Sequence, residues 1–143
     1  MRWLGGVQST FQVVQEVEYF RKAELQDGFT FWVVERISDG QFLGFCGLLR
    51  IREPYCRFRN AVEIGWRMRE SEWRNGYAFE AATRARDFAF EALGLSQIVS
   101  RAAAGNKPSW KLMRKLGMER RRELDYRALA NVATYMVFDD HEV

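Results

Sequence analysis

Cysteine, proline and histidine are scarce in this chain, which has 143 residues but two cysteines, two prolines and one histidine. Cys46 and Cys56 lack the spacing of a metal site, and two thiols cannot build a disulfide framework. We expect one buried thiol and one loop thiol rather than a disulfide or a reactive pair. His141 lies near the C-terminus, where a frayed tail is expected, so the sequence offers no Ser/His/Asp triad and predicts no metal site.

Long apolar runs are also missing from the sequence. No segment approaches the roughly 18 apolar residues that a membrane span requires, and the N-terminus lacks the basic, apolar and small-residue succession of a signal peptide. These absences predict a cytoplasmic protein. The length and a hydrophobic fraction of 48% predict a single domain over residues 1–143 with a sizeable core.

Positive charge is in slight excess, with a net charge of +3. This excess would suit an anionic ligand, but lysine and arginine are spread along the chain, which argues against nucleic-acid binding. One cluster, Arg120, Arg121 and Arg122, falls in an alternating segment predicted as a strand over residues 118–126. The cluster is either a solvated strand edge or a patch for phosphate or an acidic substrate.

The N-terminal part of the sequence predicts an amphipathic helix. Residues 9–25 have apolar side chains at helical spacing behind a Ser9 or Thr10 cap, and Asp27-Gly28 ends the helix. The predicted inward face consists of Phe11, Val13, Val14, Val17, Phe20 and Ala23.

A β-hairpin is predicted next. Residues 29–37 and 42–51 are rich in aromatic and β-branched side chains and are separated by a turn. Gly44 and Gly47 predict a bulge or a close backbone approach in the second strand, since glycine otherwise weakens a strand. Residues 52–60 have no clear period and predict a loop.

The centre of the sequence predicts a strand, a turn and a long helix. Residues 63–69 alternate, with Ile64 and Trp66 on one face, and residues 77–93 have helical period. Gly76 lies in the turn, just before a helix N-terminus whose unpaired N–H groups favour negative charge. The turn is either a plain connection or a site for a phosphate or pyrophosphate.

Alanines form one stripe of the long helix, which would let it lie close to a sheet. This predicted core stripe consists of Ala78, Ala81, Ala82, Ala85, Ala89 and Ala92. A strand over residues 97–100 follows and would pair in parallel with the strand over residues 63–69. A helix capped by Asn106 and ended by Gly117, and a last strand over residues 133–138, complete an α/β domain on a mixed sheet.

Four short blocks of sequence occur in a distinctive order and spacing. They are Glu63-Ile64-Gly65-Trp66, Trp73-Arg74-Asn75-Gly76-Tyr77-Ala78, Asn106-Lys107-Pro108-Ser109 and Leu116-Gly117-Met118. Together they resemble the GCN5-related N-acetyltransferase (GNAT) superfamily, and most of all its Rim-type branch, the ribosomal-protein-alanine N-acetyltransferases and their relatives. The resemblance covers residues 29–138. It implies a mostly antiparallel sheet with a splayed parallel pair, helices on both faces, and acetyl-CoA as co-substrate without a metal.

The same resemblance implies where coenzyme A would bind. The backbone of Met68 and Arg69 would pair with the pantetheine arm. The pyrophosphate would lie on backbone N–H groups of Arg74, Asn75, Gly76, Tyr77 and Ala78. We expect no room for a side chain at Gly76, whereas the side chain of Arg74 would contact the coenzyme or face solvent. Asn106 would reach the pantetheine amide, and it can also act as an ordinary helix cap.

Acetyl transfer from a thioester to an amine requires a polarised carbonyl, a neutral amine and a stabilised or protonated thiolate, but no covalent nucleophile. The resemblance implies that Ser109 lies near the sulfur. Many other branches use a tyrosine as general acid where this chain has Met113, which cannot donate a proton, so Ser109 would take that role. Glu63 matches a carboxylate that deprotonates the amine in several members, or else it forms a structural salt bridge.

The residues together predict an acetyl-CoA-dependent N-acetyltransferase that acts on a primary amine, either a protein N-terminus or a small amine. One alternative is a noncatalytic acyl-CoA-binding or regulatory module. A more distant one is a basic RNA- or ribosome-associated domain. The sequence cannot name the acceptor, because acceptor loops vary freely on one scaffold.

Family members usually open with a strand and a helix before the segment that resembles residues 1–28. This chain would lack them, and the strand over residues 29–37 would lie at the sheet edge with Phe31 and Val33 poorly covered. We therefore expect a homodimer or larger assembly, formed by edge pairing or helix exchange, or else an unstable chain whose true start lies upstream.

Overall fold

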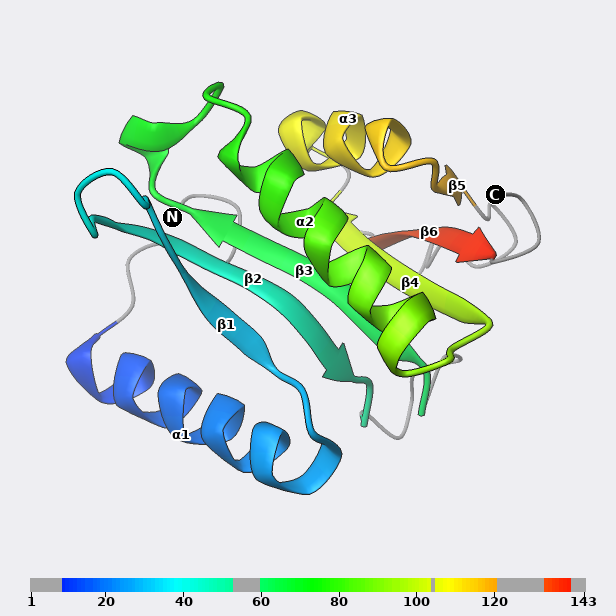
Figure 1. Ribbon diagram of the computed structural model, residues 1–143, viewed down its shortest axis with the longest axis horizontal. Coiled ribbons are helices and arrows are strands. Elements are labelled where there is room, and N and C mark those ends of the chain that lie inside the picture. The colour runs from blue at the N-terminus through cyan, green and yellow to red at the C-terminus, as the bar shows by residue number, and fades with distance from the viewer. Residues whose placement is uncertain (1–8, 53–59, 104, 121–132, 140–143) are drawn as a thin grey trace.

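The computed structural model describes residues 9–52, 60–103, 105–120 and 133–139 (Figure 1). The elements in chain order are α1 (Thr10–Asp27), β1 (Phe31–Glu35), β2 (Phe42–Arg50), β3 (Val62–Met68), η2 (Glu70–Glu72), α2 (Tyr77–Asp87), η3 (Phe88–Ala92), β4 (Gln97–Ala103), α3 (Lys107–Lys115), β5 (Glu119–Arg120) and β6 (Ala133–Asp139). Six strands form one sheet in the order β1-β2-β3-β4-β6-β5. Only β3 and β4 pair in parallel among these described strands, which confirms the predicted mixed sheet.

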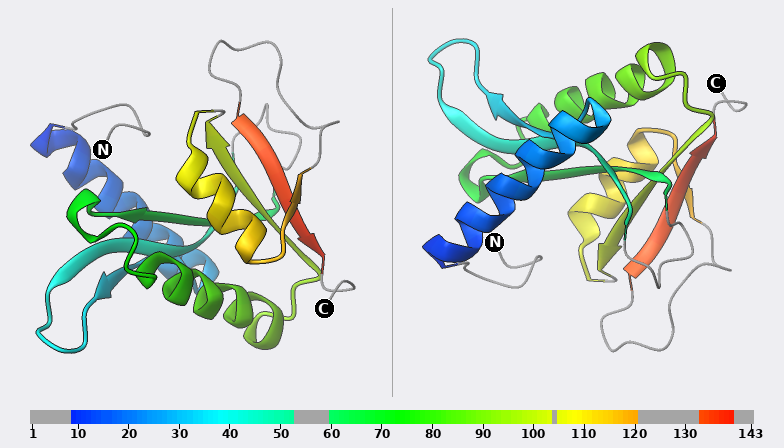
Figure 2. Two further views of the ribbon diagram at one scale, coloured as in Figure 1. Left: turned by 90° about the horizontal axis from the view of Figure 1, so that it is seen from above. Right: turned by 90° about the horizontal axis from the view of Figure 1, so that it is seen from below.

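Helices cover both faces of the sheet, as predicted. Residues of α2 and α3, including Ala82 and Met113, share one buried cluster with Ile64 of β3. On the other face, α1 packs through Phe20 and Ala23 against β2. Figure 2 shows α1 and α2 on opposite sides of the first three strands.

Helix α1 begins and ends as the sequence predicts. Ser9 caps it in a reciprocal capping box with Gln12, and Gly28 closes it in the left-handed conformation with a φ of 82°. The predicted inward face is wrong for its N-terminal half, since Phe11, Val13, Val14 and Val17 are exposed and only Phe20 and Ala23 are buried. The apolar stripe is present, but only Phe20 and Ala23, in the C-terminal half of the helix, are buried against the sheet.

Two glycines of β2 allow close backbone packing against the chain on either side of the strand. A Cβ at Gly44 would lie 2.1 Å from the carbonyl oxygen of Arg67, and a Cβ at Gly47 would lie 2.1 Å from the carbonyl oxygen of Thr30. The β1–β2 register also shifts between Val34 and Glu35. The structure therefore shows both the close approach and the bulge that the sequence predicts.

The alanine stripe of α2 faces the sheet until the helix changes its winding. Ala82, Ala85 and Ala89 are buried, whereas Ala92 is exposed, so the prediction is wrong at that residue. Residues Phe88–Ala92 form a π-helical turn, whose extra residue per turn moves the later positions out of phase.

Strands β3 and β4 diverge soon after they meet. Strand β2 pairs with β3 from Gly44 to Arg50, but β3 and β4 share the single register match Glu63 with Val99 among the described residues. The hydroxyl of Ser100 donates a hydrogen bond to the carbonyl of Ile64 at 2.9 Å near the point of divergence. The resulting gap between the strands is the splay that the family resemblance implies.

Strand β1 lies at the described edge of the sheet. Val33 is 57% exposed there, whereas the ring of Phe31 packs against Phe20 of α1, so the prediction of poor cover is confirmed for Val33 and wrong for Phe31. Cys46 is buried and free, and burial raises the pKa of its thiol to about 12, which suits the predicted inert role.

Several predictions lie outside the described residues. They concern Cys56, Arg121, Arg122, His141 and most of the loop over residues 52–60. Within the described part of the chain, no helix is long and apolar enough to cross a membrane.

Candidate active site

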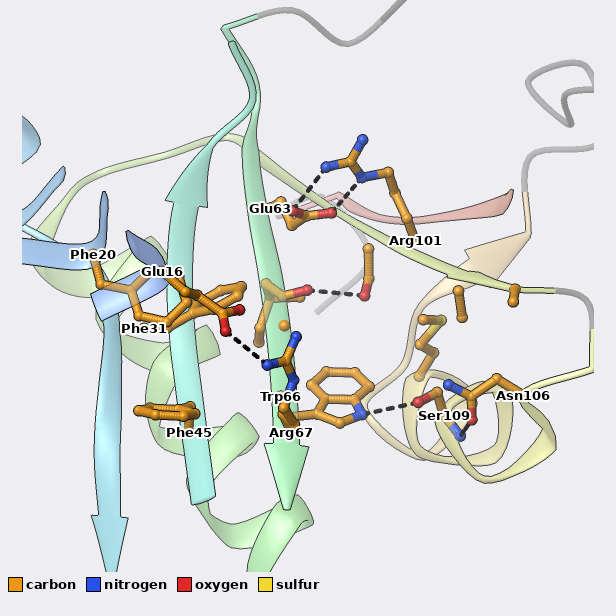
Figure 3. A pocket seen from close by; sticks show the side chains of 16 residues that line it. Glu16, Phe20, Phe31, Phe45, Glu63, Trp66, Arg67, Arg101, Asn106 and Ser109 are labelled. Carbon is orange, nitrogen blue, oxygen red and sulfur yellow. Dashed lines mark hydrogen bonds and ion pairs between the residues drawn. The ribbon is translucent and has the colours of Figure 1, made fainter. Parts of the chain in front are cut away.

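A cavity of about 360 Å³ occupies the gap between β3 and β4 (Figure 3). Its lining comes from α1, from strands β1 to β4 and from α3. One end is formed by Asn106, Ser109 and Met113, and the other by Glu16 of α1 with three phenylalanine rings. The cavity therefore reaches from the α3 face of the sheet to the α1 face. No cluster of metal-binding side chains occurs in the part of the chain that the structure describes.

Ser109 lies in the first turn of α3 with its hydroxyl in the cavity. Its Oγ accepts a hydrogen bond of 3.2 Å from the indole Nε1 of Trp66. A hydroxyl that accepts this bond still has its own proton to donate. The Trp66 contact therefore fixes the position of the Ser109 oxygen and leaves the hydroxyl proton available for a second hydrogen bond.

Asn106 caps α3, as the sequence predicts. Its side-chain oxygen accepts a hydrogen bond of 3.3 Å from the backbone N–H of Ser109, and the residue lines the cavity. Met113 is buried and lines the same cavity. At this position a thioether can contact a ligand but cannot supply a proton.

Glu63 forms the salt bridge that the sequence left as one of two alternatives. Its carboxylate accepts hydrogen bonds from Nε and Nη2 of Arg101 at 2.6 and 3.1 Å. The side chain is only 14% exposed. Both oxygens are engaged by one guanidinium, which leaves this carboxylate less available to an incoming amine.

The backbone near the end of β3 differs from the expectation for Arg69. Its N–H donates to the carbonyl of Leu43 at 2.7 Å and its carbonyl accepts from Glu72 at 2.9 Å, so the prediction that Arg69 offers free backbone groups is wrong. The carbonyl of Met68 accepts from the indole of Trp73 at 2.9 Å. Because the carbonyl of Ile64 points toward β4, strand alternation directs the backbone of Trp66 and Met68 to the same side.

The turn before α2 contains two residues in the left-handed conformation. Arg74 has a φ of 70° and Gly76 a φ of 79°, and no side chain caps α2 at Gly76 in the described structure. The N–H groups of the first helical turn therefore lack an intrahelical acceptor. Tyr77 and Ala78, which provide two of them, are half-buried.

Room at Gly76 is not limited by the protein, contrary to expectation. A Cβ there would meet no atom within 4 Å, so the positive φ, and not crowding, explains the glycine. The side chain of Arg74 is exposed. Asn75 donates to the carbonyl of Glu72 at 3.4 Å, which holds the turn against η2.

Two further ionic and aromatic features of the cavity were not predicted from the sequence. Glu16 of α1 accepts a hydrogen bond of 3.0 Å from Nη1 of Arg67, and Trp66 holds Ser109. The position of Glu16 inside the apolar stripe of α1 could have indicated that its carboxylate has a partly buried partner. For Trp66, strand alternation indicated only a core residue, because its partner lies 43 residues away.

Comparison with known proteins gives the family. The family model described as acetyltransferase (GNAT) domain matches residues 1–119. Among curated proteins, the uncharacterised protein YkkB of Bacillus subtilis is 29% identical over 82% of this chain and 67% of its own length. The uncharacterised N-acetyltransferase YoaA of the same organism is 26% identical over 82% of this chain. The chain spans 64% of the length of YoaA.

Solved structures agree with this assignment at the level of the fold. An acetyltransferase from Agrobacterium tumefaciens superposes with a TM-score of 0.80 at 22% identity, covering 97% of this chain and 77% of that one. RimJ of Mycobacterium smegmatis, in complex with CoA-disulfide, superposes with a TM-score of 0.72 at 20% identity, covering 99% and 69%. On the family match, the chain belongs to the acetyltransferase (GNAT) domain family.

Proposed function

We propose that this chain binds acetyl-CoA and transfers its acetyl group directly to a primary amine, either a protein N-terminus or a small amine. The observation that carries the proposal is the cavity between β3 and β4, which runs from Ser109 on α3 to Glu16 on α1. Two substrates could reach such a cavity from opposite faces of the sheet. Membership of the GNAT family and the CoA-disulfide complex of RimJ support the choice of coenzyme.

The coenzyme would lie between the start of α2 and the cavity. The backbone N–H groups of Gly76, Tyr77 and Ala78 suit a pyrophosphate, because they lack intrahelical acceptors and lie at the positive end of the helix dipole. Arg74 and Asn75 complete the turn. The pantetheine arm would follow the backbone of Met68 and Trp66 toward the amide of Asn106.

Ser109 is proposed as the general acid. When the nitrogen–carbon bond forms and the carbon–sulfur bond breaks, the Ser109 hydroxyl would give its proton to the departing sulfur. The Trp66 N–H, 3.2 Å from Oγ, would stabilise the charge left on that oxygen. A protonated amine loses two protons in this reaction: one would pass through water to Glu63, and the other would restore the Ser109 hydroxyl.

Glu63 remains the proposed base, with Arg101 as its partner. A carboxylate gripped by a guanidinium can act on the amine through a water molecule while the ion pair stays intact. Replacement by glutamine would keep the shape of the side chain and remove its basicity. The pH–rate profile of Glu63→Gln should lose its alkaline rise, and an unaltered profile would remove Glu63 from this role.

Thermal unfolding of the protein, measured with and without coenzyme A, tests the proposed function. Saturating coenzyme should raise the melting temperature of the parent protein, since it binds only the folded state. Gly76→Glu should abolish this rise, because a carboxylate would face the pyrophosphate. Gly94→Glu is the matched control, since Gly94 also has a positive φ of 63° and open space but lies beyond α2. No stabilisation of the parent would contradict the proposal.

Turnover separates the proposed transferase from a noncatalytic acyl-CoA-binding module. Release of free thiol, measured over a panel of amines and N-terminal peptides, should exceed the rate without acceptor. Stabilisation by coenzyme without such release would favour the noncatalytic module. Absence of saturable coenzyme binding would instead favour the RNA- or ribosome-associated alternative.

A further inference from the structure

The α1 end of the cavity combines apolar rings with one carboxylate. The ring of Phe20 lies 5.4 Å from that of Phe31 and 5.7 Å from that of Phe45, and all three line the cavity. Figure 3 shows Glu16 beside these rings, with its carboxylate directed toward Arg67. This end therefore offers an apolar wall and a negative group side by side.

The absence of a side chain at Gly65 makes room for the Phe31 ring. A Cβ at Gly65 would come within 2.5 Å of the tip of the Phe31 ring, so the ring rests on the bare backbone of β3. The ring of Phe31 consequently lies over the strand between the side chains of Glu63 and Arg67. An apolar surface is thus built into the wall that carries both ion pairs.

The two carboxylates of the cavity differ in how fully they are used. Both oxygens of Glu63 accept hydrogen bonds from Arg101, and its side chain is 14% exposed. Glu16 accepts one bond, through Oε2, and its side chain is 23% exposed. Among the described residues its Oε1 has no hydrogen-bond partner. An ammonium group has three donors and no acceptor, so Glu16 is the better partner for it.

We propose that Glu16 captures the ammonium group of the acceptor as it enters and that the Phe20, Phe31 and Phe45 rings hold its apolar body. The nitrogen then moves on toward the thioester once it has given a proton, through water, to Glu63. This inference rests on the proposed function and names the substrate class, a small primary amine with an alkyl or aryl body. A cavity of about 360 Å³ that must also admit the thioester leaves room for a small molecule. Acidic acceptors are disfavoured because both guanidinium groups of this wall are already paired with carboxylates.

The test uses 2-phenylethylamine as the acceptor probe and ethanolamine as a probe without an apolar body. Glu16→Gln keeps the size of the side chain and an acceptor for Arg67 but removes the charge. We expect the KM for 2-phenylethylamine to rise about 10- to 100-fold, the range for a charge-assisted hydrogen bond. The KM for acetyl-CoA should stay within about twofold, and Glu16→Asp should recover part of the loss. Glu18→Gln is the matched control, since this residue of the same helix is 53% exposed and pairs with Arg21.

A second variant tests the apolar wall without touching the charge. Phe45→Leu should raise the KM for 2-phenylethylamine several-fold and leave that for ethanolamine unchanged. An equal effect on both probes would overturn the assignment of the rings.

Binding of 2-phenylethylamine, measured by calorimetry in the presence of coenzyme A, separates this inference from the proposed function. Binding to the parent that is lost in Glu16→Gln, with no thiol release by any amine, would uphold the site and contradict the transferase. Equal affinity of the parent and of Glu16→Gln, or no binding to either, would overturn the inference whatever the transfer assay shows.

Discussion

The two faces of the sheet are covered in different ways. On one face, Ala82 and Ala85 of α2 and Ala89 of η3 are 0%, 5% and 0% exposed and bring the helix close to the strands. On the other face, α1 buries Phe20 and Ala23, while Phe11 and Val14 remain 69% and 55% exposed. The face that carries the proposed coenzyme site is thus closely packed along α2.

Hydrogen bonds and ion pairs attach α1 to the rest of the protein where apolar packing is sparse. Asp27 accepts hydrogen bonds from Arg52 at 2.9 and 2.8 Å, and Thr30 donates to the carbonyl of Phe20 at 2.7 Å. The Glu16–Arg67 pair adds a third tie, which also lines the cavity. A helix attached in this way can change its exposed and cavity-facing residues without disturbing the coenzyme side. This arrangement gives a physical reason why acceptor specificity can vary on one scaffold.

The largest expected effect lies on the closely packed face, at Ser109. If the hydroxyl protonates the leaving sulfur, Ser109→Ala should lower kcat by about 10- to 1000-fold and leave the affinity for acetyl-CoA nearly intact. Trp66→Phe, which removes the N–H donor to Oγ, should cause a smaller loss in kcat. Steady-state kinetics on both variants provide the measurement, and parental turnover in Ser109→Ala would return this residue to a structural role.

A matched pair of substitutions measures the packing difference directly. Ala82→Leu would overfill a site with no exposed surface and should lower the free energy of unfolding by about 1–3 kcal/mol. Val14→Leu, on the exposed half of α1, should change it by less than about 0.5 kcal/mol. Urea unfolding of both variants gives the comparison, and equal shifts would mean that the two faces are packed alike.

A pH series tests the polar tie at Asp27. Hydrogen bonds from Arg52 lower the pKa of the Asp27 carboxyl, whose side chain is 8% exposed. Its stabilisation is therefore full above the unfolded-state pKa, about 3.9, and is lost as the pH falls through the lower folded-state value. Asp27→Asn should cost about 1–2 kcal/mol at pH 7, and the difference from the parent should shrink in acid. Glu18→Gln is the matched control, because its ion pair with Arg21 is exposed.

The smallest effect on folding is expected at the edge strand. Val33, 57% exposed on β1, should tolerate lysine within about 0.5 kcal/mol of unfolding free energy. If the protein self-associates through this edge, as the sequence predicts, Val33→Lys should shift it toward the monomer. Light scattering over a concentration series measures this, and a parent protein that stays at 16.8 kDa would contradict the predicted assembly.

Much of the secondary structure follows from local signals. The Ser9 cap, the Gly28 stop and the Asn106 cap act over three or four residues, so their positions can be predicted without the fold. The glycines at positions 44 and 47 also predict a close contact or a bulge from the sequence alone, since glycine otherwise destabilises a strand.

The errors arise where a local pattern depends on distant partners. The period of α1 identifies an apolar face, but it does not show that only Phe20 and Ala23 of that face are buried. Ala92 leaves its stripe because the π-turn changes the helical phase. Likewise, the N–H of Arg69 is consumed by Leu43 across the sheet.

The sequence by itself determined the order of the elements, the left-handed turn at Gly76 and the presence of Asn106 and Ser109 at the start of α3. These features depend on residues close together in the chain, where backbone propensity and capping act. Only the tertiary structure decided that Trp66 holds Ser109, that Glu63 pairs with Arg101 and that Glu16 enters the cavity from α1. Each of these contacts joins segments separated by tens of residues, and the divergence of β3 from β4 sets their distance.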